Sequence, residues 1–421
     1  MEFNTFITLG EVVDLLGDGL HGTPKYDING EYHFINGNNL INGDIVIKEN
    51  TKKVDLGEYL KYKKKLNSRT ILVSINGTLG NVATYKNEKV ILGKSACYFN
   101  VKKEINKDYI RYIVEDGNFQ NYIRQFATGT TIKNVSLKTM RDYKFYLPGV
   151  KQQIKVVNTL KPIDNLIKTN REIIYNLEKF AQTLFKHWFI DFEFPNEQGQ
   201  PYKSSGGEMV ESELGEIPKN WTVITIKDVC DANKGSLSKK DNWSYINYLD
   251  TSNITNNSIE NIQFIDATKD KIPSRAKRKI QPNDIVYSTV RPNQYHYGII
   301  KEPTENMIAS TGFTVLRSKG VYPNDLIYLW LTQKEVTDKL QAIAEQSTSA
   351  YPSIKADDIL SMKILLPQKK ELAVLAEIIE VQNKVIWNKQ QENKKLSELR
   401  DTLLPKLLSG EIKIPDEVVV D

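Results

Sequence analysis

The sequence contains two copies of one pattern, and this internal repeat constrains the possible folds more than any other feature. The dipeptide Leu147–Pro148 recurs 219 residues later as Leu366–Pro367. At the same offset, and without a gap, Thr183–Leu184 recurs as Thr402–Leu403. A repeat of this length predicts two units of the same fold, related by pseudo-two-fold symmetry within one chain.

A long helix is expected after the first dipeptide. Its apolar residues recur at alternating steps of three and four, which is the heptad pattern of a packed helix pair, with one polar interruption at Asn170. About 40 residues at about 1.5 Å each would form a rod near 60 Å long, which suits a spacer. Pro162 is expected to kink or split this helix near its start. The expected seam consists of Leu160, Ile163, Ile167, Asn170, Ile174, Leu177, Ala181, Leu184 and Trp188.

The second copy has a weaker stripe of the same kind, because its middle is polar at Lys389 and Asn393. Its seam positions are Leu375, Ile379, Gln382, Ile386, Lys389, Asn393, Leu396, Arg400, Leu403 and Leu407. We therefore expect neighbouring apolar residues to share the packing face, namely Ile378, Val381, Val385 and Leu399. Two helices that bury only each other would also explain most of these residues.

Each helix follows a block with mixed α/β character. Runs rich in β-branched and aromatic residues predict strands at Ile45–Lys48, Thr70–Ile75, Lys89–Leu92, Ala96–Val101, Asp284–Val290 and Phe313–Leu316. Apolar steps of three and four predict helices at Asp108–Gln125 and Asn324–Ile343. The expected organisation is a block at 1–148, a helix at 149–192, a linker at 193–220, a block at 221–367, a helix at 368–412 and a tail at 413–421.

The charge distribution is typical of a protein that binds a polyanion at two places. The formal net charge is +5 overall, and the two blocks are basic, while the segment between them is acidic. Ordinary surface charge would give the same totals. No apolar run is long enough to span a membrane, and the N-terminal residues do not read as a secretory signal. The two cysteines favour a reducing cytoplasm, and the four histidines have no zinc-ligand spacing.

Motifs for catalysis do not fit their context. Gly17–Gly22 matches the dinucleotide-binding glycine pattern, but no convincing strand is expected just before it, and Pro24 stands where a helix should continue. Gly93–Ser95 resembles the end of a phosphate loop, yet Glu88 occupies the place of its first glycine. No metal-nuclease carboxylate cluster and no nucleophile with an assignable base were found, which favours a binding protein.

Polar, glycine-containing loops occur at matching places in the two copies and are the candidate DNA-binding sites. Asn, Gln and Arg side chains can read base edges, while Ser, Thr and Lys suit phosphates. Any one of these residues could equally belong to an ordinary turn. In the first copy the candidates are Thr23, Lys25, Tyr26, Asn76, Thr78, Asn81, Thr130, Thr131, Lys133 and Asn134. In the second they are Lys234, Ser236, Lys239, Arg291, Asn293, Gln294, Tyr295, Ser347, Ser349, Tyr351 and Ser353.

Two basic runs, Lys61–Lys65 and Arg275–Lys279, could contact phosphates or could simply be solvated faces.

Three segments resemble the specificity (S) subunits of type I restriction-modification systems. Leu399–Ile412 is similar to the C-terminal signature of that family, and Leu184–Phe192 is similar to the end of its central helix. Leu214–Trp221 resembles the start of its second target-recognition domain. With the repeat, the resemblance covers essentially the whole chain. The variable blocks match the family only at scattered positions.

The resemblance implies an α+β protein in which two target-recognition domains are separated by two long antiparallel coiled-coil helices. Each domain would read one half of a bipartite double-stranded DNA site, and the helices would set the gap between the halves. Two methyltransferase (M) subunits would bind the chain and carry S-adenosylmethionine, and motor-nuclease (R) subunits would complete the endonuclease. The chain itself would bind no cofactor or metal and would have no catalytic residue.

Two other classes of function remain open from the residues alone. A stand-alone methyltransferase or nuclease with an unrecognised site would modify or cut DNA without a partner. An adaptor that binds only proteins through its coiled coil would show no sequence-dependent DNA binding. Neither the DNA sequence read nor the spacer length follows from the residues, because DNA shape also contributes to recognition.

Overall fold

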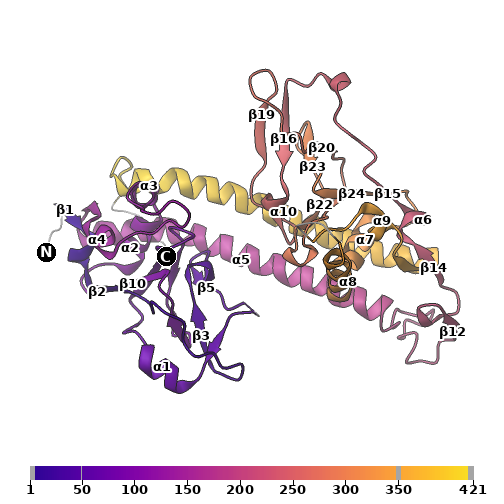
Figure 1. The fold of residues 1–421 in the computed structure, drawn as a ribbon, viewed down its shortest axis with the longest axis horizontal. Helices are drawn as coiled ribbons and strands as arrows, with labels where there is room; N and C mark the ends of the chain where they lie inside the picture. The colour runs from indigo at the N-terminus through magenta and orange to yellow at the C-terminus, as the bar shows by residue number, and fades with distance from the viewer. Residues whose placement is uncertain (1–4, 49, 348–351, 416–421) are drawn as a thin grey trace. The chain divides into compact units, whose positions relative to one another are not determined.

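The computed structural model of the chain describes residues 5–48, 50–347 and 352–415. It divides into two compact units, of which the first comprises residues 1–169 and 392–421 and the second comprises residues 170–391. Two helices of 40 residues each, α5 (Val150–Phe189) and α10 (Lys369–Leu408), each have one half in either unit. These are the magenta and yellow helices in Figure 1, and they confirm the two long helices expected from the repeat.

The first unit contains a four-stranded antiparallel sheet and a smaller three-stranded sheet. The larger sheet has the order β2 (Val13–Asp18), β10 (Ala96–Val101), β7 (Thr70–Ser74) and β8 (Val82–Thr84). The smaller has the order β6 (Lys53–Val54), β3 (Tyr32–Ile35) and β9 (Val90–Leu92), with β3 and β9 parallel. The first unit also contains two separate two-stranded sheets, which pair β1 (Thr5–Thr8) with β11 (Lys144–Leu147) and β4 (Leu40–Ile41) with β5 (Asp44–Ile45). The helices are α1 (Leu56–Tyr62), α2 (Lys107–Glu115), α3 (Gly117–Gln125), α4 (Leu137–Asp142) and the 3₁₀ helices Leu9–Val12 and Gly37–Asn39.

The second unit repeats this topology. It has two four-stranded sheets, of which the antiparallel one has the order β15 (Cys230–Ala232), β24 (Phe313–Ser318), β21 (Asp284–Ser288) and β22 (Tyr297–Ile300). Its other sheet has the order β19 (Gln263–Asp266), β16 (Tyr245–Leu249), β23 (Met307–Ser310) and β20 (Ala276–Lys279), with β16 and β23 parallel. The pairs are β14 (Thr222–Thr225) with β25 (Lys363–Leu366), β17 (Ile254–Thr255) with β18 (Ser258–Ile259), and β12 (Met209–Ser212) with β13 (Gly215–Pro218). The helices are α6 (Ile226–Val229), α7 (Asn324–Leu331), α8 (Lys334–Glu345), α9 (Ala356–Leu360) and the 3₁₀ helices Lys239–Asp241, Thr251–Asn253 and Pro292–Gln294.

The match between the two sheet orders confirms the duplication and the mixed α+β fold class. β2-β10-β7-β8 in the first unit corresponds to β15-β24-β21-β22 in the second, and the other sheet of each unit contains one parallel pair, β3 with β9 and β16 with β23. The central strands β7 and β10 are buried at every residue. A strand covered on both faces is continuously apolar, not alternating, which is why β7 carries Ile71, Leu72 and Val73 in succession.

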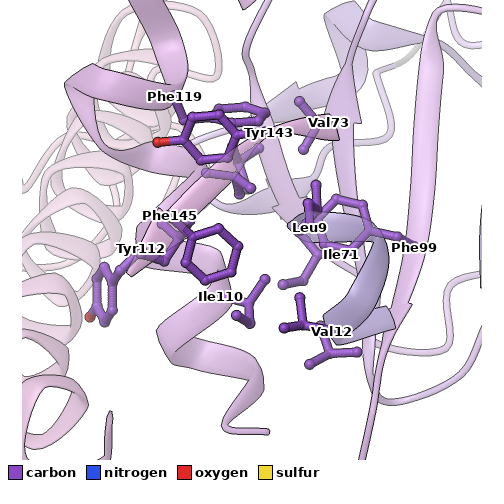
Figure 2. Packing of buried hydrophobic residues seen from close by; sticks show 14 of the residues in the cluster. Leu9, Val12, Ile71, Val73, Phe99, Ile110, Tyr112, Phe119, Tyr143 and Phe145 are labelled. Carbon is purple, nitrogen blue, oxygen red and sulfur yellow. The ribbon is translucent and has the colours of Figure 1, made fainter. Parts of the chain in front are cut away.

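Each core includes residues from both long helices. In the first unit, the core formed by the block also contains Val156 and Leu160 of α5 and Leu404 and Leu407 of α10. Figure 2 shows part of this core, where Phe119 and Tyr143 meet edge to face with their ring centroids 4.9 Å apart. Because the start of α5 and the end of α10 share this core, the two helices run antiparallel within the unit.

The same antiparallel arrangement occurs in the second unit, with the helix ends exchanged. Here the end of α5 supplies Ala181, Phe185 and Trp188, and the start of α10 supplies Leu375 and Ile379. The expected seam residues of both helices are buried or half-buried along these segments. Since each block is packed on one end of both helices, burial of apolar surface holds it there.

Of the two outcomes expected at Pro162, a kink or a split of α5, the split does not occur. The helix continues through it from Val150 to Phe189. A proline removes the hydrogen bond to the carbonyl four residues earlier. Pro162 and Asn158 are both on the exposed side of the helix, where water can satisfy the freed carbonyl.

The prediction that neighbouring apolar residues of α10 share its packing face was also wrong. Their exposed fractions are 36% for Ile378, 57% for Val381, 39% for Val385 and 47% for Leu399. Polar side chains of α10 face inward where another element supplies a partner, which is α5 in the first unit and the block in the second. For example, Arg400 lies 3.6 Å from Asp164 and Gln390 donates to the carbonyl of Asn257 at 3.3 Å.

Each of the two block helices expected as one element is two helices in the structure. The first breaks at Asp116, which adopts an extended conformation and caps α3 by accepting a hydrogen bond from the Asn118 amide at 3.0 Å. The second breaks between α7 and α8, where Gln333 is extended. Asp116 is a signal for a helix start, but the regular apolar spacing through this segment predicted a single helix instead.

Three further expectations differ from the structure. The strand expected at Ile45–Lys48 covers only Asp44–Ile45. The segment expected as a linker contains the β12–β13 hairpin, and its Phe194 and Ile217 are buried in the second core. A strand, β2, does end within the glycine pattern at 17–22, but no helix follows it before residue 37, so the dinucleotide interpretation still fails.

Candidate nucleic-acid interface

Two of the candidate loops in the first unit lie against each other. Asn76 Nδ2 donates to Asn134 Oδ1 at 3.1 Å, although these residues are 58 positions apart. The backbone amide of Gly77 donates to the carbonyl of Lys133, and that of Val135 donates to the carbonyl of Ile75. Loops 75–81 and 128–134 therefore form one surface, which we call the first loop pair. Its exposed candidates are Thr78, Thr130, Thr131, Lys133 and Asn134.

The third candidate segment of this unit does not join the first loop pair. The amide of Lys25 donates to Glu58 Oε2 of α1 at 2.9 Å, and the Tyr26 ring lies 6.0 Å from that of Phe34. Within the described residues of this unit, Thr23, Lys25 and Tyr26 make no hydrogen bond to loops 75–81 or 128–134. These residues are exposed, so they could contact DNA only as a separate surface.

Asn81 is half-buried and closes its own loop. Its carbonyl accepts from the Ser74 amide at 2.8 Å, its amide donates to Ser74 Oγ at 2.8 Å, and its side chain donates to the carbonyl of Gly37 at 3.4 Å. A side chain engaged in this way holds the loop and has little capacity left for a base edge.

The second unit forms an equivalent surface from loop 289–297 and the described residues Ser347, Pro352 and Ser353, which we call the second loop pair. The amide of Arg291 donates to the carbonyl of Pro352 at 3.0 Å, and the amide of Ile354 donates to the carbonyl of Thr289 at 2.8 Å. These two bonds match those made by Gly77 and Val135 in the first unit. Sequence reasoning identified both pairs of loops, but not that the members of each pair are bonded together.

Most candidates of the second loop pair are exposed. The Asn293 amide donates to Gln341 Oε1 of α8 at 3.3 Å, which fixes the turn that carries Asn293, Gln294 and Tyr295. Ser347 Oγ accepts from the Ser353 amide at 3.4 Å, so these two serines brace the adjoining loop. Ser349 and Tyr351 lie outside the described residues.

The remaining candidates of the second unit lie along an edge strand. Ser236 forms a bridge with Arg278 of β20, and the Leu237 amide donates to the carbonyl of Lys277 at 2.7 Å. Lys234 forms an ion pair with Asp231 at 2.6 Å, and this contact lowers the pKa of the Asp231 carboxyl. Lys239 begins the short 3₁₀ helix Lys239–Asp241. This segment lies beside β20 at the edge of its sheet. These contacts do not join it to the second loop pair.

The two basic runs have different surroundings. Lys61, at the end of α1, is exposed and 3.9 Å from Glu58. In the other run, Lys279 pairs with Asp241 and lies 5.2 Å from the Trp243 ring, while Arg275 and Lys277 are exposed. Arg275 and Lys277 are thus the exposed residues of this run, which the sequence offered as a possible phosphate contact.

In the described part of the chain, no group of three or more His, Cys, Asp or Glu residues could hold a metal ion. A search of the described helices found none long and apolar enough to cross a membrane. Cys97 and Cys230 are both buried and unpaired with each other.

The fold and site together define a duplicated protein. Each of its two units presents an exposed polar loop pair and packs on both long helices. Residues 1–179 and 218–399 match the family model described as the type I restriction modification DNA specificity domain. The chain therefore belongs to this family and is a specificity subunit, whose role is DNA sequence recognition.

Two curated relatives and one solved structure are similar to this chain. The MjaIX specificity subunit of Methanocaldococcus jannaschii is 25% identical over 359 residues, covering 82% of this chain and 78% of the relative. The HindI specificity subunit of Haemophilus influenzae is 22% identical over 335 residues, covering 67% and 72%. The structure of a type I S subunit from M. genitalium aligns with a TM-score of 0.53 at 17% identity, covering 98% of this chain and 96% of that one. This last similarity concerns the fold alone.

Proposed function

We propose that this chain is the non-catalytic recognition subunit of a type I methyltransferase and endonuclease. Each unit reads one half of a bipartite DNA site, and the two long helices set the unread gap. Two methyltransferase subunits dock on the helices and supply S-adenosylmethionine, and motor-nuclease subunits complete the restriction enzyme. The assembly works in the reducing cytoplasm, in keeping with its two buried free cysteines.

The observation that carries this proposal is the recurrence of one loop-pair geometry with different residues. The backbone bonds Gly77–Lys133 and Arg291–Pro352 are equivalent, and both measure 3.0 Å. The side chains around them differ, because the first pair contains Asn76, Gly77 and Thr78, and the second contains Val290, Arg291 and Pro292. Side chains in contact with base edges determine the sequence that is read, while contacts to phosphates position the protein on the DNA. One loop-pair scaffold with different side chains therefore suits two different half-site sequences.

Attachment of each block to both helices supports their role as a spacer. In the first unit, Arg111 of α2 donates to Asp164 of α5 at 2.7 Å, and Arg400 of α10 is 3.6 Å from the same carboxylate. In the second unit, Gln182 of α5 donates to Thr332 at 2.6 Å, and Asn383 of α10 donates to Asp325 of α7. A reader fixed to a helix in this way moves when the helix is lengthened.

Exposed apolar residues at repeat-equivalent helix positions support the docking of two similar partners. Leu166 and Val385 correspond through the repeat and are 40% and 39% exposed. Phe180 and Leu399 also correspond and are 53% and 47% exposed. Each unit therefore presents one such residue from each helix, which gives two similar partners equivalent positions to contact.

Co-expression with the methyltransferase partner tests the function. We expect adenine methylation at a single bipartite site only when both chains are present, with the purified chain alone inactive. Genome-wide mapping of methylated adenines gives both the site and the gap. Turnover by the chain alone, free of partner by mass spectrometry, would contradict the non-catalytic assignment.

A heptad inserted into both helices, near Leu177 and Leu396, tests the spacer. Seven residues add about 10.5 Å and preserve the seam, which corresponds to about three base pairs of B-DNA. The unread gap should lengthen by about that amount while both half-sites stay the same. A single-residue insertion rotates the stripe by about 100° and should abolish assembly. An unchanged gap in a folded, active heptad variant would exclude the helices as the spacer.

A further inference from the structure

The two loops that follow the equivalent strands β7 and β21 close in the same way. The amide of Ser74 donates to the carbonyl of Asn81 at 2.8 Å, and the amide of Ser288 donates to the carbonyl of His296 at 2.9 Å. The loop of the second unit is one residue longer. Because both ends of each loop are fixed by equivalent bonds, positions within the loops can be compared directly.

Both loops have a positive φ at the third residue after the serine and again at the residue before the closing bond. In the first unit these residues are Gly77 (φ 73°) and Gly80 (φ 87°). In the second they are Arg291 (φ 47°) and Tyr295 (φ 58°). The fold therefore demands the left-handed conformation at these two places, and only the first copy meets that demand with glycine.

Arginine and tyrosine in this conformation reduce stability, because Cβ approaches the following carbonyl oxygen. Among the described non-glycine residues with positive φ, all except Phe192, Arg291 and Tyr295 are asparagine, which tolerates it. Phe192 packs against the Trp221 ring at 5.8 Å, which accounts for its place. Tyr295 is 39% exposed, and its ring meets that of Tyr297 edge to face at 6.2 Å, which accounts for its place in the same way. Arg291 is exposed, so burial does not account for its conformation. Strain of this kind persists at sites where the side chain has a function.

We propose that Arg291 determines the specificity of the second unit by reading a guanine edge in its half-site. This inference rests on the proposed function and deepens it. The Arg291–Pro352 bond fixes the backbone beneath the side chain at the centre of the second loop pair. A guanidinium can donate two parallel hydrogen bonds to guanine O6 and N7, the commonest specific contact between a side chain and a base. The first unit has Gly77 at this place, so its loop contributes backbone and the Asn76 amide instead.

Arg291→Gly and Arg291→Lys separate reading from folding. The full chain in complex with its methyltransferase partner is tested against a library of DNA duplexes. Arg291→Gly should reduce discrimination by about ten- to hundredfold at one guanine of the half-site read by the second unit. Circular dichroism should show that this variant still folds, because glycine adopts the left-handed conformation without strain. Arg291→Lys keeps the charge but lacks the planar fork, and it should lose the same discrimination with a smaller loss of overall affinity.

Asn87→Gly is the matched control, because Asn87 has φ 69° in the first unit outside both loop pairs. It should change neither half-site. An equal loss of affinity for every sequence in Arg291→Gly would indicate a phosphate contact and overturn the proposal. An unchanged preference would also overturn it. If the wild-type complex shows no sequence preference at all, the proposed function itself fails, and this assignment fails with it.

Discussion

The two units share one topology but fix their blocks to the long helices with different chemistry. In the first unit, Asp164 of α5 accepts from Arg111 and from the Tyr112 hydroxyl, both at 2.7 Å, and Arg400 of α10 is nearby. Arg111 also bonds Glu115 at 3.1 Å. Burial raises the pKa of the Glu115 carboxyl, although the neighbouring Arg111 acts in the opposite direction.

The second unit has neutral residues where the first has the Asp164–Arg400 pair. At the repeat offset of 219, Asn383 is equivalent to Asp164, and the buried Ala181 is equivalent to Arg400. Attachment there depends on an aromatic cluster, in which the Phe189 and Phe194 rings lie 5.1 and 4.9 Å from that of Trp221. Trp221 Nε1 also donates to Glu371 Oε2 of α10 at 2.7 Å.

The two blocks therefore pack on equivalent parts of the long helices through different side-chain contacts. Partly buried ion pairs attach the first block to the helices through directional contacts. Their formation removes charges from water, which costs free energy. Aromatic packing ties the second block through buried area, together with the hydrogen bonds from Asn383 to Asp325 and from Trp221 to Glu371. The two attachments should therefore respond differently to mutation and to pH.

Exchange of one block gives the largest expected effect on this comparison. Replacing residues 1–148 by the equivalent block of a relative should change one half of the methylated site completely and leave the other half as it was. The physical reason is that each loop pair is built within one unit, as the Asn76–Asn134 bond illustrates. Methylome sequencing of the hybrid gives the answer. A change in both halves would show that the units do not read independently.

Trp221→Ala should be the most damaging single substitution in the second attachment. Loss of a buried indole leaves a cavity, and we expect a loss of about 3–5 kcal/mol in the free energy of unfolding. Hydrogen exchange resolved by peptide should show faster exchange mainly in the second unit. Trp221→Phe is the matched control, because it keeps a ring and loses only the bond to Glu371. Equal acceleration in both units would mean that the attachments are not separate.

Much of this fold could be predicted from the sequence, because the repeat and the heptad steps depend on local spacing. The wrong expectations arose where tertiary partners decide burial. Val381 and Leu399 are more apolar than the seam residue Arg400, yet Arg400 faces inward because Asp164 is there to pair with it. No window of local sequence contains both partners.

The candidate site was predictable at the level of loops and less so at the level of residues. Polar composition and the matched positions in the two copies identified loops 75–81 and 289–297. Composition could not show that Asn81 is engaged in closing its loop, nor that Lys234 is paired with Asp231. The left-handed backbone at Arg291 was hidden as well, since no glycine marks it. It becomes visible only when equivalent hydrogen bonds align the two loops.

Asp164→Ala should weaken the first attachment, by about 2–4 kcal/mol, because it leaves partly buried Arg111 with one partner fewer. Hydrogen exchange should now accelerate mainly in the first unit, the converse of Trp221→Ala. Asp338→Ala is the control, because it breaks an exposed ion pair with Lys334 on α8 and should cost less than about 0.5 kcal/mol. If the two aspartate variants are equally stable, the buried cluster does not hold the first block.

Glu178→Gln has the smallest expected effect and tests the response to pH. Burial of Glu178 in α5 raises the pKa of its carboxyl from 4.5 to about 7, despite a hydrogen bond from Asn257. Tyr297 and Tyr328 also face it, while the equivalent position on α10 is Ser397. Between these two pH values the folded chain holds a proton that the unfolded chain has lost, so stability falls as pH rises through this range.

Glutamine is neutral at every pH, so the variant should remove this part of the pH dependence. At pH 8 it should raise the free energy of unfolding by about 1–2 kcal/mol, and at pH 4 it should leave it unchanged within about 0.5 kcal/mol. Urea unfolding at both pH values, followed by hydrogen exchange, measures the gain and locates it in the second unit. A wild-type stability that is flat between pH 4.5 and 7, or a gain of equal size at pH 4, would show that the Glu178 proton is not what distinguishes the units.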